Sequence, residues 1–362
     1  MSDKKYTVGF SDKKVEDAKL MAQKYGNSKK KVIFDCRGEG SCPGDLLMLT
    51  AAIRDLHYSH PGKYLTNVIT EHDHIWENNP YIFPLQETSR GAVVTEVHYP
   101  LIHQSCQGQY HFIHGFRKEI EKRLKINIEP TFFHGDIHLS DQEKSWMSQI
   151  EEMGIEDKFW IIVAGGKKDY TCKWWDPDNY QMVVNHFKNK ITFVQVGHES
   201  DWHPKLDNVI DMIGKTDLRQ LIRLIYHSVG VLCPVTFAMH AAAAIPTRHV
   251  PPLNRACVVV AGGREPTHWE AYPYHRYLSA VGTMVCCDNG GCWHSRCQRV
   301  GDDDRKDKKD LCEFPVEISP KKFDNKQLFI PKCMNDISVD DVIRAIESYY
   351  VGGVLKYNAN EK

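Results

Sequence analysis

The sequence predicts an α/β protein made of two successive β/α domains. Short apolar runs typical of buried strands alternate with segments of helical apolar spacing, a pattern typical of parallel sheets. The alternation restarts near residue 156, and 362 residues are many for a single core. We therefore expect a polar appendage over residues 1–30, a first domain over 31–155, a second domain over 156–337, and a C-terminal helix and tail over 338–362.

The composition excludes several classes of protein. Hydrophobic residues make up 42% of the chain and charged residues 26%, which argues against a disordered or fibrous protein. The 46 Lys and Arg residues balance 47 Asp and Glu residues, so nucleic acid is an unexpected partner. No apolar run is long enough for a membrane span or follows Met1 as a signal segment, so we expect a cytoplasmic protein. The twelve cysteines then read as free thiols or metal ligands.

The first domain opens with a strand, a glycine-rich turn and a helix. Lys31–Asp35 reads as a buried strand, Arg37–Gly44 as the turn, and Asp45–Leu56 as a helix with Asp45 at its N-cap. The glycine spacing of the turn is one residue too long for a dinucleotide fingerprint, and no Gly-Lys-Ser/Thr step marks a P-loop. We therefore expect the backbone of this turn to pass close to a ligand, with Asp45 at the end of the turn. The alternative is that Asp45 is only the cap of the helix.

The remaining elements follow from the same apolar patterns and from Gly and Pro positions. We predict a short hairpin around Tyr6–Phe10, strands at Tyr64–Thr70, Lys158–Ala164, Ile191–Gly197, Val229–Cys233 and Ala256–Ala261, and helices at His111–Leu124, Ser140–Met153, Pro177–Lys188, Leu218–His227, Phe237–Ala244 and Ser338–Tyr350.

Two places in the second domain suit a phosphate group. Thr236 separates a strand from the alanine-rich helix, so free N–H groups at that helix start could meet an anion. His240, one turn into the helix, is either a ligand or a structural residue. Gly165 and Gly166 follow another strand and lead to Lys173, a cation that could meet a diphosphate or simply be solvated.

Six of the twelve cysteines lie between residues 286 and 333, where core-forming periodicity is missing and a staple is expected. Four thiolates would close a tetrahedral site for zinc or iron. The candidate ligands are Cys287, Cys292, Cys312 and Cys333, with Cys286 and Cys297 as spares. Reduced cysteines in an ordered insertion are the alternative.

Four stretches together resemble the family-nine glycosyltransferases, the heptosyltransferase family, and within it the autotransporter heptosyltransferases. The stretches are Gly44–Arg54, Asn208–Leu218, Cys233–His240, and Ala261–Pro273 followed by Cys286–Trp293. The resemblance implies a GT-B architecture, in which two Rossmann-like domains face a cleft. The first domain would be the acceptor side, the second would bind the nucleotide-sugar donor and carry the cysteine-rich metal-binding insertion, and the last helix would cross back to the first.

The resemblance also implies an inverting sugar transfer without a catalytic metal. Asp45 matches the general base, which takes the proton of the acceptor hydroxyl. Lys173 and the helix start at Thr236 would meet the charge on the leaving diphosphate. The donor-binding residues would be Gly165, Gly166, Lys173, Thr236, Phe237, Met239 and His240. Val235-Thr236-Phe237 stands where many members have an Asp-Thr/Ser-Gly step.

The expected function is transfer of heptose or a similar sugar from a nucleotide diphosphate, ADP-heptose above all, to Ser/Thr hydroxyls of a protein such as an autotransporter adhesin. The same chemistry on a glycan or a modified nucleobase is one alternative. A non-catalytic sugar-nucleotide-binding assembly protein is another. The subgroup further implies structural iron on the cysteines and a homo-oligomer.

Overall fold

The computed structural model describes residues 29–38, 41–98, 100–249, 252–323 and 325–358. The appendage, with its hairpin at Tyr6–Phe10, lies outside them except for its last two residues. The chain divides into two units. Unit 1 comprises Met1–Gln104 and Tyr110–Trp146, and unit 2 comprises Ser105–Gln109 and Met147–Lys362. Each unit holds a parallel sheet, as the alternating pattern predicts.

Unit 1 is built on a three-stranded sheet with the order β2-β1-β3. Its apolar cluster includes Ile33 and Leu65, and its longest helix, α2, is buried from Leu46 to Leu56. The elements of unit 1 are β1 (Lys30–Asp35), α2 (Pro43–Ser59), β2 (Tyr64–Ile69), η1 (Asp73–Ile75), β3 (Ala92–Glu96), η2 (Pro100–Gln104), η3 (Phe112–His114), α3 (Gly115–Leu124) and α4 (Asp141–Ser145).

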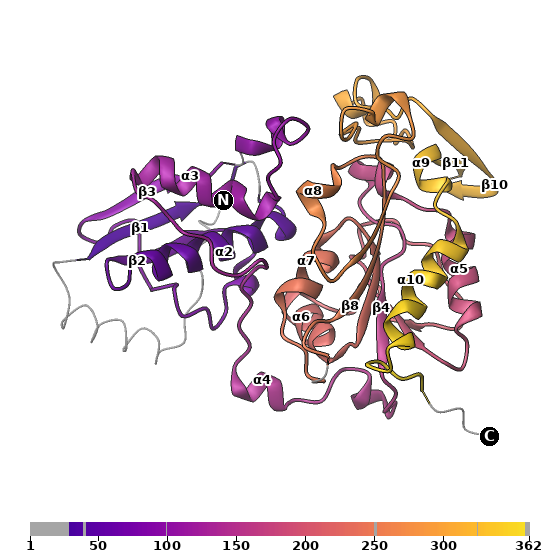
Figure 1. The fold of residues 1–362 in the computed structure, drawn as a ribbon, viewed down its shortest axis with the longest axis horizontal. Helices are drawn as coiled ribbons and strands as arrows, with labels where there is room; N and C mark the ends of the chain where they lie inside the picture. The colour runs from indigo at the N-terminus through magenta and orange to yellow at the C-terminus, as the bar shows by residue number, and fades with distance from the viewer. Residues whose placement is uncertain (1–28, 39–40, 99, 250–251, 324, 359–362) are drawn as a thin grey trace. The chain divides into compact units, whose positions relative to one another are not determined.

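Unit 2 is built on a six-stranded sheet with the order β6-β5-β4-β7-β8-β9. Figure 1 shows α6 and α7 on one face of this sheet and α5 and α10 on the other. The elements of unit 2 are η4 (Glu151–Met153), β4 (Phe159–Ile162), η5 (Lys168–Lys173), α5 (Pro177–His186), β5 (Thr192–Gln195), β6 (Ile210–Asp211), α6 (Leu218–His227), β7 (Gly230–Pro234), α7 (Phe237–Ala244), β8 (Ala256–Gly262), α8 (Thr267–Glu270), β9 (Arg276–Ser279), η6 (Val285–Cys287), η7 (Arg305–Asp307), β10 (Pro315–Phe323), β11 (Lys326–Pro331), α9 (Lys332–Asn335) and α10 (Val339–Val351).

Three sequence predictions about local structure are wrong. Asp45 is not the N-cap of α2: Cys42 holds that position, Pro43 starts the helix, and Asp45 lies in the first turn. Proline is favoured at a first helical position because its missing N–H is not needed there. The helix predicted over Ser140–Met153 is α4 alone, followed by the separate turn η4. The chain is extended at Trp146, and Ser148 Oγ accepts a hydrogen bond from the Glu151 N–H at 3.0 Å, which starts a new turn.

The cysteine-rich segment, predicted to lack a core, has a small one. β10 and β11 form an antiparallel hairpin, which packs Ile318, Phe323, Leu328 and Ile330 against Trp174. The pattern was hidden because the two strands contribute few apolar residues each and the fifth member of the cluster lies about 150 residues away in the chain.

Arg255 fixes the end of α7 on the sheet. Its guanidinium is buried and donates to five backbone carbonyls, among them those of Ala242 and Ile245 at the end of α7. We expect Arg255→Met to lower the free energy of unfolding by about 2–4 kcal/mol, because buried carbonyls lose their donor. Denaturant unfolding checks this against Arg344→Met, which removes an exposed ion pair with Asp341 and should cost less than about 1 kcal/mol. Equal losses in the two variants would contradict the prediction.

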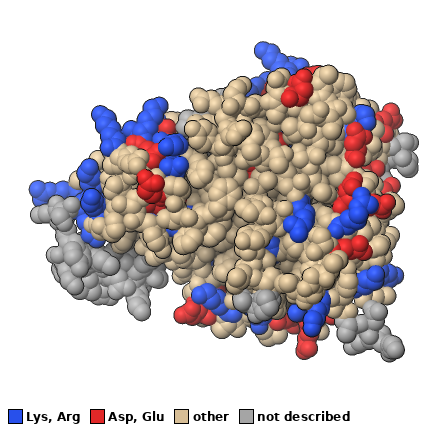
Figure 2. Space-filling model, viewed as in Figure 1, with Lys and Arg blue, Asp and Glu red and all other residues tan. Residues whose placement is uncertain are grey.

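None of the helices in the described part of the chain is long and apolar enough to cross a membrane. On the face drawn in Figure 2, positive and negative side chains are interspersed, without an extended surface of one sign. The mixture of charges on this face agrees with the near-zero net charge of the chain.

Candidate functional site

Three loops of unit 2 leave the same edge of its sheet. β4, β7 and β8 are parallel neighbours, so the segments after Ile162, Pro234 and Gly262 all begin at the carboxyl edge of the sheet. This edge is where open α/β sheets bind ligands. The predicted donor-binding residues lie in the first two of these segments. The third adds Glu265, to which the sequence analysis assigned no role.

The two glycines after β4 have a clear structural reason. A Cβ at Gly165 would lie 2.2 Å from the carbonyl oxygen of Trp202, and the backbone φ there is +85°. Gly166 exchanges two backbone hydrogen bonds with Trp202, at 2.8 and 3.1 Å. The glycines therefore set the course of the loop that leads to Lys173. Their contact with a donor remains a prediction.

Lys173 reaches the start of α7. Its ammonium donates to the carbonyl oxygen of Val235 at 3.1 Å and lies 2.8 Å from Glu265 Oε1. It also lies 5.8 Å from the ring centre of Tyr170. The side chain is one quarter exposed, so the cation is held in place and still reachable from solvent.

The first turn of α7 has no side-chain cap. Thr236 is the N-cap residue, and its hydroxyl makes no capping hydrogen bond. Thr236 and Phe237 are partly exposed. N–H groups at such a helix start, beside an ammonium group, form an arrangement that suits a phosphate. The structure thus brings together Lys173 and the start of α7, and their contact with a donor remains a prediction.

Met239 and His240 point into the protein rather than to its surface. Met239 is fully buried, and His240 is 4% exposed. His240 Nδ1 lies 2.9 Å from the hydroxyl of Tyr272, and Nε2 lies 3.5 Å from Glu270 Oε2. These contacts favour the structural reading of His240, so its role toward a donor remains a prediction.

Asp45 lies in unit 1, partly buried in the first turn of α2. The helix is anchored at its other end by Arg54, whose buried guanidinium donates to the carbonyls of Phe132 and His134 and to Thr131 Oγ1. The buried helix fixes the backbone at Asp45, and the role of this carboxylate as a general base remains a prediction.

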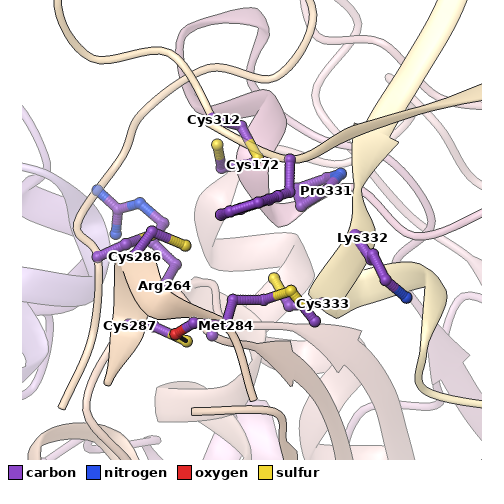
Figure 3. Close-up of a pocket in the computed structure, with 12 residues that line it drawn as sticks. Cys172, Arg264, Met284, Cys286, Cys287, Cys312, Pro331, Lys332 and Cys333 are labelled. Atoms are coloured by element: carbon purple, nitrogen blue, oxygen red, sulfur yellow. Dashed lines mark hydrogen bonds between the residues drawn. The ribbon is translucent and has the colours of Figure 1, made fainter. Parts of the chain in front are cut away.

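Six cysteines line one pocket in unit 2 (Figure 3). They are Cys172 in η5, Cys286 and Cys287 in η6, Cys292 and Cys312 in the loops that follow, and Cys333 at the start of α9. Gly263, directly after β8, makes room for one of these sulfurs, since a Cβ at this position would lie 3.0 Å from Cys287 Sγ. Among the described residues, no three of these side chains are already arranged as a metal-ligand set.

Backbone N–H groups mark out four of these sulfurs. Cys287 Sγ accepts from the Gly282 N–H at 3.3 Å. Cys292, Cys312 and Cys333 accept hydrogen bonds from the N–H groups of His294, Phe314 and Gly263. In Cys292, Cys312 and Cys333 these bonds favour thiolate over thiol. The same four cysteines are the candidate ligands of the sequence analysis, and their binding of a metal remains a prediction.

Ionisation differs strongly among the thiols. Hydrogen bonds from Cys172 and Cys297 lower the pKa of Cys312, whereas burial raises the pKa of Cys292 and of Cys333 to about 11. A bound divalent cation would reverse the effect of burial, because a coordinated thiol is deprotonated. The chemistry of the donor set thus fits a thiophilic metal such as iron or zinc.

Sequence reasoning missed two residues of this region. Cys172 lies more than 100 residues before the cysteine-rich segment, yet lines the same pocket. Glu265 is 2% exposed and carries the anionic partner of Lys173. No local signal marks either role, because both depend on the order of strands in the sheet.

No protein-family model matches the chain, and no curated protein matches its sequence. Solved structures do match. A family 9 glycosyltransferase from Veillonella parvula is 11% identical, with 69% of this chain and 85% of that one covered and a TM-score of 0.52. The ADP-heptose lipopolysaccharide heptosyltransferase II of E. coli is 12% identical, with 90% and 100% covered and a TM-score of 0.52.

Two structures of TibC, a dodecameric iron-containing glycosyltransferase from enterotoxigenic E. coli, are also similar. They are 13% and 14% identical, each with 90% of this chain and 77% of that one covered, and their TM-scores are 0.57 and 0.53. At such identities the likeness concerns the fold. The mixed α/β architecture with parallel sheets fits the GT-B fold of these glycosyltransferases.

Proposed function

We propose that this protein is an inverting glycosyltransferase that moves heptose, or a similar sugar, from ADP-heptose to Ser/Thr hydroxyls of a protein. The observation that carries the proposal is the meeting of Lys173 with the uncapped start of α7 at the carboxyl edge of β4 and β7, in a chain with the fold of family 9 glycosyltransferases. Heptosyltransferase II is named for ADP-heptose, and TibC has been solved with ADP-D-β-D-heptose, which supports the choice of donor.

The proposed reaction is a displacement at the anomeric carbon. Asp45 takes the proton of the acceptor hydroxyl while that oxygen forms its bond to the anomeric carbon. The bond from that carbon to the diphosphate breaks, and the electron pair leaves with the diphosphate. Lys173 and the N–H groups of the first turn of α7 stabilise the charge that develops there. Inversion follows because the acceptor attacks opposite the leaving group.

The cysteine pocket is proposed to hold a structural iron or zinc ion. Its ligands would be Cys287, Cys292, Cys312 and Cys333, the four sulfurs that accept backbone N–H groups. TibC is described as iron-containing, which supports iron. Four thiolates leave no open coordination position, so the ion would organise residues 286–333 and take no part in the transfer. TibC is also dodecameric, which supports a homo-oligomer here, checked by light scattering.

Donor binding is the first test. We expect ADP-heptose to raise the melting temperature more than ADP-, UDP-, GDP- or CDP-linked hexoses do. A ligand at 100 times its Kd adds about 2.7 kcal/mol to the stability. Calorimetry then measures the affinity. Absence of binding by any sugar nucleotide to the folded, metal-loaded protein would contradict the proposal and favour a structural role.

Acceptor choice needs a separate measurement. The protein, ADP-heptose and a Ser/Thr-rich adhesin fragment are expected to give a product heavier by one heptose residue, removable by alkaline β-elimination. Transfer to an oligosaccharide instead of the protein would keep the transferase and overturn the protein acceptor.

A further inference from the structure

Lys173 and the cysteine pocket are joined by two pairs of adjacent residues. Cys172 lines the pocket, and the next residue is Lys173. Arg264 also lines the pocket, and the next residue is Glu265, which binds Lys173. The cationic end of the proposed donor site is therefore connected to the pocket through the chain on both sides.

Glu265 holds two cations at once. Its Oε1 lies 2.8 Å from Lys173 Nζ and accepts a hydrogen bond from Arg264 as well. The carboxylate is 2% exposed, and its Oε2 is buried with no hydrogen-bond donor among the described residues. The charges of Arg264 and Lys173 outweigh burial and keep the pKa of Glu265 below its ordinary value. The carboxylate therefore stays ionised, and both Arg264 and Lys173 stabilise its charged form.

Arg264 is itself fixed at the edge of the pocket. Its side chain is 9% exposed. The guanidinium donates to the His294 carbonyl at 2.7 Å and lies 5.2 Å from the ring centres of both Trp293 and Tyr170. His294 also supplies the N–H that Cys292 Sγ accepts. The backbone that turns around the cysteines thus also holds the guanidinium to which Glu265 is bound.

We infer that Glu265 is a positioning residue, which holds the Lys173 ammonium at the start of α7 and ties it through Arg264 to the cysteine pocket. The inference rests on the proposed function for its kinetic consequence. A lysine held at a fixed point opposes the charge on a leaving diphosphate without reorganising during the reaction. A lysine without its carboxylate partner would sample many rotamers. The entropic cost of fixing its side chain would then have to be met in each turnover.

Glu265→Gln tests the inference by kinetics. It keeps the shape of the side chain and removes its charge. We expect kcat to fall about 10-fold or more, with a smaller change in KM, because the lost interaction grows in the transition state. Glu265→Asp keeps the charge, withdraws the carboxylate by one methylene, and should also lower kcat. This variant replaces Glu265→Gln in the test if the Gln variant does not fold. The matched control is Glu347→Gln, which removes a partly exposed carboxylate paired with His186 and should leave kcat unchanged.

A double-mutant cycle separates positioning from a general structural role. If Glu265 acts through Lys173, adding Glu265→Gln to Lys173→Ala should change kcat by less than about twofold. Multiplying losses would mean that Glu265 acts elsewhere, and the inference would be wrong.

A readout without turnover keeps this inference apart from the proposed function. Acetylation of Lys173 by acetic anhydride, followed by mass spectrometry, should be several-fold faster in Glu265→Gln than in the wild type and the Glu347→Gln control. A wild type that transfers no sugar but shows this difference would contradict the proposed function and keep the positioning role. Unchanged acetylation, together with unchanged kcat, would overturn the inference.

Discussion

Asp45→Asn is expected to lower kcat for sugar transfer by about 10²–10⁴-fold, the range typical of a lost general base. Asparagine has nearly the same shape but cannot take a proton from the acceptor hydroxyl. Donor affinity, measured by calorimetry with ADP-heptose, should stay nearly unchanged because the proposed donor contacts lie in unit 2. The melting temperature should change little, since a first-turn carboxylate contributes only about 0.3–1 kcal/mol to its helix.

The control for Asp45 is Glu71→Gln, which changes an exposed carboxylate of the same unit and should keep wild-type turnover. Wild-type turnover in Asp45→Asn would remove the base assignment. Loss of fold or of donor binding in that variant would show that Asp45 has a structural role instead.

Replacing any one of Cys287, Cys292, Cys312 or Cys333 by serine is expected to remove the metal and to lower stability by several kcal/mol. The size follows from structural zinc sites, which supply about 10–16 kcal/mol of binding energy to small domains. The expected loss of stability is smaller than this binding energy, because the hairpin β10–β11 has its own apolar cluster, which remains when the metal is lost. Elemental analysis should give about one iron or zinc per wild-type chain, and thermal unfolding with a chelator should reproduce the loss.

Cys172 and Cys286 offer a sharper comparison within the same pocket. Neither is among the four that accept the backbone N–H groups described above, so Cys172→Ser and Cys286→Ser should retain the metal. Cys42→Ser, an exposed thiol of unit 1, controls for loss of a cysteine as such. A wild type that is folded, freshly prepared and free of both metals would contradict the site. Metal loss in Cys286→Ser with retention in Cys287→Ser would reassign the ligands.

The regular elements could be predicted where local signals agree. The helix α7 has the predicted bounds, Phe237–Ala244, and Ser338 caps α10 with the capping box that its neighbour Asp341 completes. Strand β8 was predicted to within one residue. In these places the local apolar pattern and the residues at its two ends indicate the same element, and tertiary packing is consistent with both.

The sequence was less informative where two signals compete or where partners are distant. At the start of α2, Pro43 and Asp45 both mark a helix beginning, and the proline prevails. The pairing of Lys173 with Glu265 spans 92 residues of chain and exists because β4, β7 and β8 are neighbours in the sheet. No periodicity within a segment carries that information, so the candidate site could be predicted in its parts but not as an assembly.

The 3-10 segment η5 constrains how this protein can diverge. Cys172 serves the sulfur-lined pocket and Lys173 serves the start of α7, so consecutive positions face different tasks. One residue inserted or deleted between Gly166 and Lys173 would turn the side chains at positions 172 and 173 away from their present partners. The cysteine pocket and the start of α7 would then be disturbed together. Relatives of this chain should therefore keep the length of this loop even where its residues change.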